Sequence, residues 1–143
     1  MMYLLDADTI SLCVRENQNV IHAFQNHDPE NLCISSVTRM EIEFGLQLIP
    51  NRRNKLDRKL DPIFDQTTSI GYSIEDARFT AIAKAQLQLA GTPIGFYDIM
   101  LAGTALARGL ILSRTTLTNT RESLVYALKI GVFPNEFKQY FPN

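Results

Sequence analysis

Residues 2–9 read MYLLDADT, a short apolar run that stops on an aspartate, and this stretch decides the fold. A buried strand that ends this way places a carboxylate at the carboxyl edge of a sheet, where open α/β folds bind ligands. Asp6 and Asp8 can lie close together there, and two carboxylates repel each other unless a proton or a cation lies between them. Mg²⁺ suits such a site because it takes oxygen ligands. The alternative is that both aspartates only cap the following helix.

Length and composition predict an ordinary globular protein with a single domain over residues 1–143. The chain is 45% hydrophobic and 20% charged, and its net charge of -1 argues against coating nucleic acid by bulk electrostatics. Cys13 and Cys33 form no C-x-x-C pair, so we expect buried thiols in a reducing compartment. With no signal peptide and no membrane-length apolar stretch, a cytoplasmic protein that does not enter the membrane is expected.

Strands and helices are predicted to alternate along the chain, which indicates an α/β fold with a largely parallel sheet. The predicted strands cover residues 2–5, 32–35, 67–72 and 110–113, with a last strand within 125–132. The predicted helices cover residues 9–15, 20–25, 37–48, 51–64, 73–90 and 98–108.

Three of these helices carry apolar residues at helical spacing, from which we expect core-facing stripes. The stripes are Val37, Met40 or Glu41, Phe44 and Leu48; Leu56, Leu60, Ile63 and Phe64; and Ala77, Ala81, Ile82, Ala85 and Leu89.

Three acidic residues occupy strand-to-helix junctions or the margins of apolar helices. Asp6 ends the first strand, Glu41 lies in the helix that follows the second strand, and Asp98 heads the most hydrophobic helix. A carboxylate at the edge of a buried surface is unfavourable unless it is paired, protonated or bound to a metal. The pattern therefore predicts a metal site that is assembled from several loops.

Three segments resemble the signature blocks of PIN-domain ribonucleases, most closely the VapC-type toxins of toxin–antitoxin pairs. They are residues 3–10 (YLLDADTI), residues 34–45 (ISSVTRMEIEFG) and residues 91–102 (GTPIGFYDIMLA). The blocks span nearly the whole chain in the right order and spacing. The resemblance implies a single PIN-like domain, an α/β/α sandwich around a mostly parallel sheet of four to five strands.

The resemblance also implies that Asp6, Glu41 and Asp98 coordinate Mg²⁺ or Mn²⁺, with Asp8 as a secondary ligand. The family usually has Asn at the position of Asp8, and the change keeps an oxygen ligand. In such a site the metal orients the scissile phosphate of RNA and lowers the pKa of a bound water, which hydrolyses the phosphodiester bond.

The fourth site position of the family is harder to assign in this chain. Asn119 is the best candidate, and Thr115 or Thr116 takes the position if the alignment is kept without a gap. Arg39 and Arg114 flank the proposed site segments, so we expect them to contact RNA phosphates.

The resemblance further implies a structured RNA substrate such as tRNA and a cognate VapB-like antitoxin. We expect a homodimer that forms through the helices of residues 37–64. The basic run at residues 52–59 is open to two interpretations, a phosphate contact or a solvated helix face.

Two other functions are open at this point. The first is a PIN-like module with weakened catalysis that binds RNA or protein, which the neutral Asn119 would favour. The second is a haloacid-dehalogenase-type phosphatase, whose first motif also has two aspartates but needs Thr or Val where this chain has Ile10.

Overall fold

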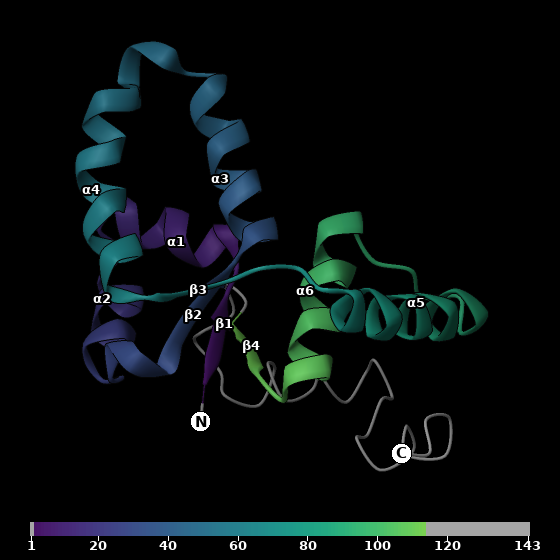
Figure 1. Ribbon diagram of the computed structural model, residues 1–143. Coiled ribbons are helices and arrows are strands. Elements are labelled where there is room, and N and C mark those ends of the chain that lie inside the picture. The colour runs from purple at the N-terminus through teal and green to yellow at the C-terminus, as the bar shows by residue number, and fades with distance from the viewer. Residues whose placement is uncertain (1, 114–143) are drawn as a thin grey trace.

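Strand β1 (Tyr3–Leu5) lies in the interior of the sheet in the computed structural model of the protein, which describes residues 2–113 (Figure 1). It lies between β2 (Leu32–Ser35) and β4 (Ile111–Ser113), and β3 (Thr68–Ile70) pairs with β2, which gives the order β3-β2-β1-β4. These pairings are all parallel. The carboxyl ends of the four strands therefore share one edge, where an α/β fold binds its ligands.

Helices cover both faces of this sheet because successive side chains of a strand point to opposite sides. Leu5 packs with Ile10 of the first helix and Leu60 of the fourth on one face. Leu4 packs with Leu101 of the last described helix on the other face. The three layers confirm the expected α/β/α sandwich.

The expected helices all form, within a few residues of their predicted bounds. They are α1 (Ala7–Val14), α2 (Gln18–Gln25), α3 (Ser36–Gln47), α4 (Arg53–Gln66), α5 (Ile74–Leu89) and α6 (Phe96–Arg108), with 3-10 turns η1 (Pro29–Asn31) and η2 (Pro50–Arg52). None of the helices within residues 2–113 is long and apolar enough to cross a membrane. The strand predicted within residues 125–132 lies outside the described residues.

Helix α6 begins two residues before Asp98, where the sequence predicted its start. Gly95 is the N-cap residue, with extended backbone angles of φ -56° and ψ 153°. Asp98 therefore lies inside the first turn, where a negative charge is stabilised by the helix dipole. The helix ends as predicted at Gly109, whose φ of 64° is the left-handed conformation that glycine adopts readily.

The predicted apolar stripe of α3 is wrong beyond Val37. Met40, Phe44 and Leu48 are 41%, 61% and 67% exposed. Helix α3 extends past the carboxyl edge of the sheet and is covered there only on the side of α4 (Figure 1). The side that is buried at this end carries Leu46, which packs near Leu60 of α4.

The predicted stripe of α5 is wrong except at Ile82, which is partly buried and packs against the core. Leu89, its last member, is 89% exposed, and Ala77, Ala81 and Ala85 are exposed as well. The buried face instead carries Asp76, Thr80, Ala83 and Leu87. Two of these residues are polar, and a helical pattern that counts only apolar residues therefore selects the opposite face.

Asp76 can be buried because it has a full set of partners. Arg108 of α6 donates two hydrogen bonds to its carboxylate, from Nε to Oδ1 at 2.9 Å and from Nη2 to Oδ2 at 2.6 Å. Burial by itself would raise the pKa of Asp76, but the hydrogen bonds from Arg108 and Ser73 outweigh it and hold the pKa below its ordinary value. This ion pair joins the start of α5 to the end of α6.

Thr80 is buried because α6 approaches α5 at a glycine. A Cβ atom on Gly103 would lie 2.0 Å from Oγ1 of Thr80 and 2.6 Å from its Cα and backbone N. The Thr80 hydroxyl also donates to the carbonyl of Asp76 at 2.8 Å, so it cannot easily move away. The two helices can keep this distance only if residue 103 has no side chain.

We expect Gly103→Ala to lower the free energy of unfolding by about 3 kcal/mol, because the added methyl group meets helix backbone and α6 must shift. Gly45→Ala is the matched control, since no atom lies within 4 Å of a Cβ built at this glycine of α3. It should raise the stability by roughly 0.5–1 kcal/mol through backbone entropy. Urea denaturation measures both, and equal effects of the two substitutions would contradict the close contact.

Candidate functional site

Asp6 directly follows β1 and is the N-cap of α1. Its Oδ1 accepts a hydrogen bond from the backbone N–H of Thr9 at 2.8 Å, and the residue is 6% exposed. The helix-cap interpretation is therefore correct for this oxygen. It does not compete with a ligand role, because a carboxylate has two oxygens and about four lone-pair positions.

The other predicted carboxylates come from the first turn of α1, from α3 and from α6. Asp8 is exposed, while Glu41 and Asp98 are partly buried. The carboxylate of Asp98 folds back toward the N-cap, since a Cβ on Gly95 would lie 3.1 Å from its Oδ2. The absence of a side chain at Gly95 thus leaves the space that this carboxylate occupies.

These four carboxylates lie close enough to interact electrostatically and form one negative cluster. The pKa of Glu41 is raised first by burial and then by the negative charges of Asp98, Asp6 and Asp8. The structure therefore brings together the residues that the sequence selected from three separate elements. Their mutual repulsion marks a site that favours a proton or a cation.

The carboxylates lie near each other without forming a closed ligand set. Within residues 2–113, no three His, Cys, Asp or Glu side chains are placed closely enough to hold a metal ion as they stand. The donor set consists of oxygen atoms only, which matches hard divalent cations such as Mg²⁺. A bound cation would require these side chains to move closer together.

A layer of buried hydroxyl groups lies at the ends of β1, β2 and β4, next to Asp6. The Thr38 hydroxyl donates to the carbonyl of Leu5 at 2.9 Å, and the Ser113 hydroxyl donates to the carbonyl of Leu4 at 3.2 Å. Ser35 is the N-cap of α3 and accepts from the backbone N–H of Thr38 at 3.2 Å. These bonds fix the carboxyl edge of the sheet, next to which the carboxylates lie.

The sequence did not predict this layer of hydroxyl groups. Thr9, Ser35, Thr38 and Ser113 are each no more than 4% exposed. The available signal was a Ser or Thr at the ends of neighbouring strands, which becomes informative only once the strands are known to be adjacent.

The structure does not place Arg39 with the carboxylates. Its guanidinium group lies 3.5 Å from the centre of the Phe64 ring, in a groove of about 480 Å³ between α3 and α4. Arg39 and Glu41 are two residues apart in α3. Each residue of an α-helix turns by about 100°, so their side chains leave the helix in directions about 200° apart. A phosphate contact of Arg39 would thus lie in this groove, away from Asp98.

The basic run of residues 52–59 is partly neutralised. Arg53 forms ion pairs with Glu43 at 2.7 Å and with Asp57 at 3.4 Å, and Lys59 pairs with Glu16 at 3.0 Å. These contacts favour the solvated-face interpretation for the paired residues.

Several predicted residues lie outside the described part of the chain. They are Arg114, Thr115, Thr116 and Asn119.

We expect Glu41→Gln to stabilise the metal-free protein at neutral pH. The raised pKa means that the folded state binds the Glu41 proton more tightly than the unfolded state does. This contribution to stability is complete below the unfolded pKa, about 4.3, and is lost as the pH rises through the folded pKa. The variant should therefore match the wild type in acid and exceed it at pH 7, by at most about 1 kcal/mol because solvent screens the site.

Denaturant unfolding in a chelating buffer, followed over pH, measures this difference. The exposed Glu30→Gln is the matched control and should show no pH-dependent gain. A Glu41→Gln variant that is less stable than the wild type at pH 7 would contradict the repulsive cluster.

Comparisons with known proteins cover most of the chain. Residues 3–116 match the sequence profile of the PIN domain. The tRNA(fMet)-specific endonuclease VapC of Salmonella typhimurium is 29% identical over 119 residues, which cover 82% of this chain and 88% of the relative.

Solved structures show the same architecture. The DNA-bound VapBC of Salmonella typhimurium aligns with a TM-score of 0.71 at 26% identity, over 78% of this chain and 84% of the other. VapBC2 of Rickettsia felis, bound to a DNA fragment from their promoter, aligns with a TM-score of 0.76 at 20% identity, over 85% and 92%. At 20% identity, the second alignment bears on the fold alone.

Proposed function

The chain belongs to the PIN domain family, and we propose that it is a metal-dependent endoribonuclease that acts as the toxin of a toxin–antitoxin pair. One observation carries the proposal: Asp6, Glu41 and Asp98 come from three elements to one edge of the sheet, where burial and then the charges of Asp98, Asp6 and Asp8 raise the pKa of Glu41. The similarity to a VapC protein that is named as an endonuclease supports it.

Mg²⁺ or Mn²⁺ fits this site by its chemistry. Asp6, Glu41 and Asp98 would hold the ion and Asp8 would assist, because all four supply oxygen donors to one negative cluster. When bound, the ion supplies a Lewis acid that polarises the phosphate and lowers the pKa of a water molecule.

The residues of the chain itself provide position and charge. Asp6 is held by its bond to Thr9, and Asp98 is held in the first turn of α6. The hydroxyl groups of Thr38 and Ser113 keep the strand ends beneath them rigid. An RNA phosphate at this edge would be oriented for in-line attack by water, with no side chain as nucleophile.

The remaining assignments extend this proposal. Asn119 would be the fourth site residue, with Thr115 or Thr116 as the alternatives, and Arg39 and Arg114 would contact RNA phosphates. The substrate would be a structured RNA, and initiator tRNA is the first to test because the Salmonella relative is named for tRNA(fMet). The partner would be a VapB-like antitoxin, which is supported by the likeness to a VapBC complex. We expect this antitoxin to present a basic residue to the carboxylates.

We expect Asp98→Asn to lower the rate of RNA cleavage by about a hundredfold or more, because it removes a charged ligand. Asp6→Asn should have the same effect, and Asn keeps the N-cap bond to Thr9 that Ala would lose at about 1 kcal/mol. Gel analysis of labelled tRNA after incubation with Mg²⁺ or Mn²⁺ measures the rates.

Asp65→Asn, which changes an exposed aspartate of α4, is the matched control and should cleave like the wild type. Full activity of Asp98→Asn would refute the site. A wild-type protein that cleaves no cellular RNA even with excess Mn²⁺ would favour the inactive binding module.

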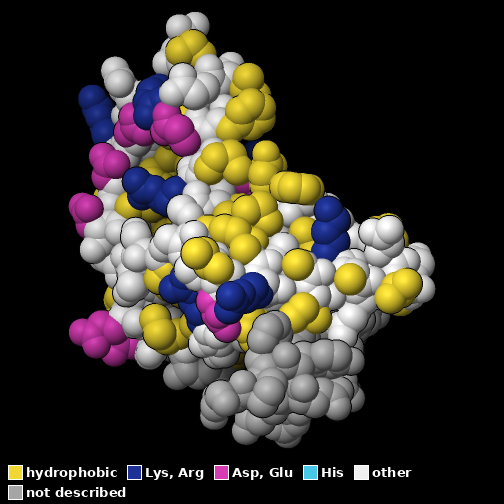
Figure 2. Space-filling view, turned by 45° about the vertical axis from the view of Figure 1, so that its right-hand side comes forward, with side chains coloured by type: hydrophobic (Ala, Val, Ile, Leu, Met, Phe, Trp, Pro, Cys, Tyr) yellow, Lys and Arg dark blue, Asp and Glu magenta, His cyan; other side chains and the backbone are white. Residues whose placement is uncertain are grey.

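An exposed apolar stripe on α3 supports the expected homodimer. Met40, Phe44 and Leu48 recur along one side of the helix and are 41% or more exposed. Figure 2 shows hydrophobic side chains gathered from the α3 region down the middle of this face. Contiguous exposed apolar surface of this kind is typical of interfaces.

We expect Phe44→Asp to convert a dimer to a monomer, because a charge would be buried in the contact. Gln18→Asp adds the same charge to an exposed position of α2 and is the matched control. Sedimentation velocity at several concentrations measures the state. A wild-type protein that is monomeric throughout would refute the proposed dimer.

A further inference from the structure

Two exposed aromatic side chains precede Asp98 in the first turn of α6. Phe96 is 67% exposed and Tyr97 is 44% exposed. Their ring centres are 6.1 Å apart and the ring planes are nearly perpendicular, at 86°. The buried part of α6 begins only at Ile99, so the packing of the helix does not require an aromatic residue at either position.

A lysine lies over the Phe96 ring. The ammonium group of Lys84, on α5, is 5.3 Å from the ring centre. The other cationic side chains of α5 and α6 have acidic partners, since Arg78 pairs with Glu75 and Arg108 pairs with Asp76. Lys84 therefore adds a positive charge next to a site that is otherwise strongly negative.

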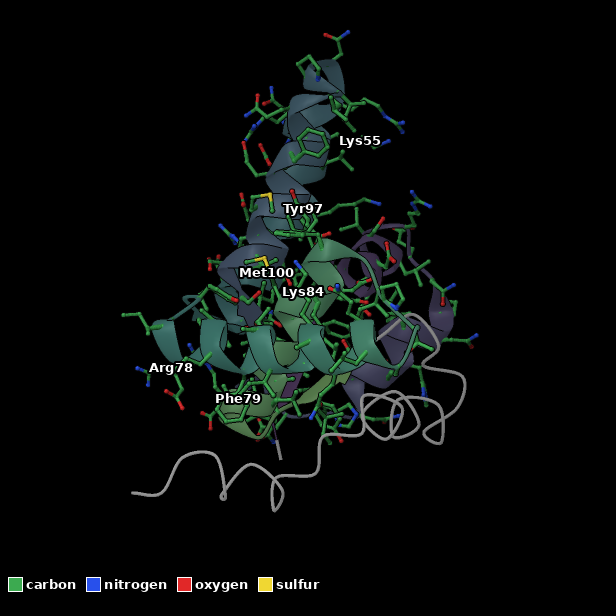
Figure 3. The ribbon with its side chains drawn as sticks, turned by 90° about the vertical axis from the view of Figure 1, so that its right-hand side faces the viewer. Lys55, Arg78, Phe79, Lys84, Tyr97 and Met100 are labelled. Atoms are coloured by element: carbon green, nitrogen blue, oxygen red, sulfur yellow. The ribbon has the colours of Figure 1, made fainter. Side chains whose placement is uncertain are left out.

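Tyr97 and Lys84 lie on the side of the molecule that carries α5 and α6. Figure 3 shows Tyr97 at the first turn of α6 and Lys84 on the neighbouring α5. Phe96 and Asp98 are two residues apart, so their side chains leave α6 in directions about 200° apart. The Asp98 carboxylate nevertheless folds back onto Gly95, the residue before Phe96, since a Cβ on Gly95 would lie 3.1 Å from its Oδ2. Both groups therefore lie at the N-terminal end of α6, where a base on Phe96 and a phosphate at Asp98 can belong to neighbouring nucleotides.

Phe96 borders a cavity of about 100 Å³ together with Leu87, Pro93 and Ile94. Its side chain is nevertheless 67% exposed, so most of the ring is open to solvent. This exposed surface is available to a base.

We propose that Phe96 is a stacking platform for an unpaired RNA base next to the scissile phosphate, with Lys84 on the adjoining phosphate. The proposal rests on the nuclease function proposed above. An aromatic face beside a cation matches one base and one phosphate, which is the combination that single-stranded nucleic acid offers. A base within a duplex is already stacked on its neighbours. The platform therefore directs cleavage to loops and other unpaired segments, whose bases are free to stack on the ring.

The chain has no tryptophan, so Phe96→Trp introduces a single indole at the platform. The variant also carries Asp98→Asn to prevent cleavage, and it is titrated with a short uridine oligoribonucleotide. We expect the oligomer to quench the indole emission. An oligomer of the same length without bases and an RNA duplex should not.

Ile74→Trp is the matched control, because Ile74 is 77% exposed at the other end of α5. Its emission should not respond to the uridine oligomer. Equal quenching of the two variants, or equal quenching by the oligomer without bases, would overturn the proposal. A blue shift of the Phe96→Trp emission with rising protein concentration alone would also overturn it, since the ring would then contact a second copy.

Steady-state kinetics of RNA cleavage distinguish a role of Phe96 in binding RNA from a role in folding. Phe96→Ala should raise KM about tenfold with little change in kcat, because the lost stacking is made equally in ground state and transition state. Phe96→Tyr should restore KM, which a purely structural role would not predict. A wild-type KM in Phe96→Ala would refute the platform and leave the nuclease intact. Quenching without any cleavage by the wild type would instead refute the nuclease and support the platform.

Discussion

The close contact between Gly103 of α6 and Thr80 of α5 determines where the site can form. Without a side chain at residue 103 the backbones approach, and α6 lies against the sheet with its first turn at the carboxyl edge. Asp98 is part of this turn, so its distance from Asp6 and Glu41 depends on a packing contact that contains no site residue. The Asp76–Arg108 ion pair fixes the same two helices at their other ends.

The surroundings of two carboxylates, Asp76 and Glu41, distinguish a structural acid from a site acid. Asp76 is fully buried, yet hydrogen bonds from Arg108 and Ser73 outweigh its burial and lower its pKa. Glu41 is only partly buried, and burial together with three neighbouring aspartates raises its pKa. The first carboxylate stabilises the helix pair, whereas the second is part of a cluster that a cation would stabilise. Opposite shifts of this kind separate structural from functional acids.

The sequence was sufficient for the order of the elements and for the places of Asp6, Glu41 and Asp98 in them, because strand-to-helix boundaries carry local signals such as the N-cap Asp6. It was insufficient for the buried faces of α3 and α5. These faces depend on which helices are adjacent, and on partners such as Arg108 that lie far away in the chain. The hydroxyl layer of Thr38 and Ser113 was missed for the same reason, since its bonds join separate strands. Asn119 lies outside the described residues.

The errors in the predicted stripes have a common physical cause. An apolar residue at helical spacing predicts burial, but it does not say whether the covering surface belongs to the same chain. Phe44 and Leu48 extend past the sheet, and Phe96 stands at the edge of the site, so this fold leaves them exposed. Water disfavours such side chains, and a second copy or an RNA base would cover them. These unburied residues, more than the core, are therefore the surfaces through which the fold can meet its partners.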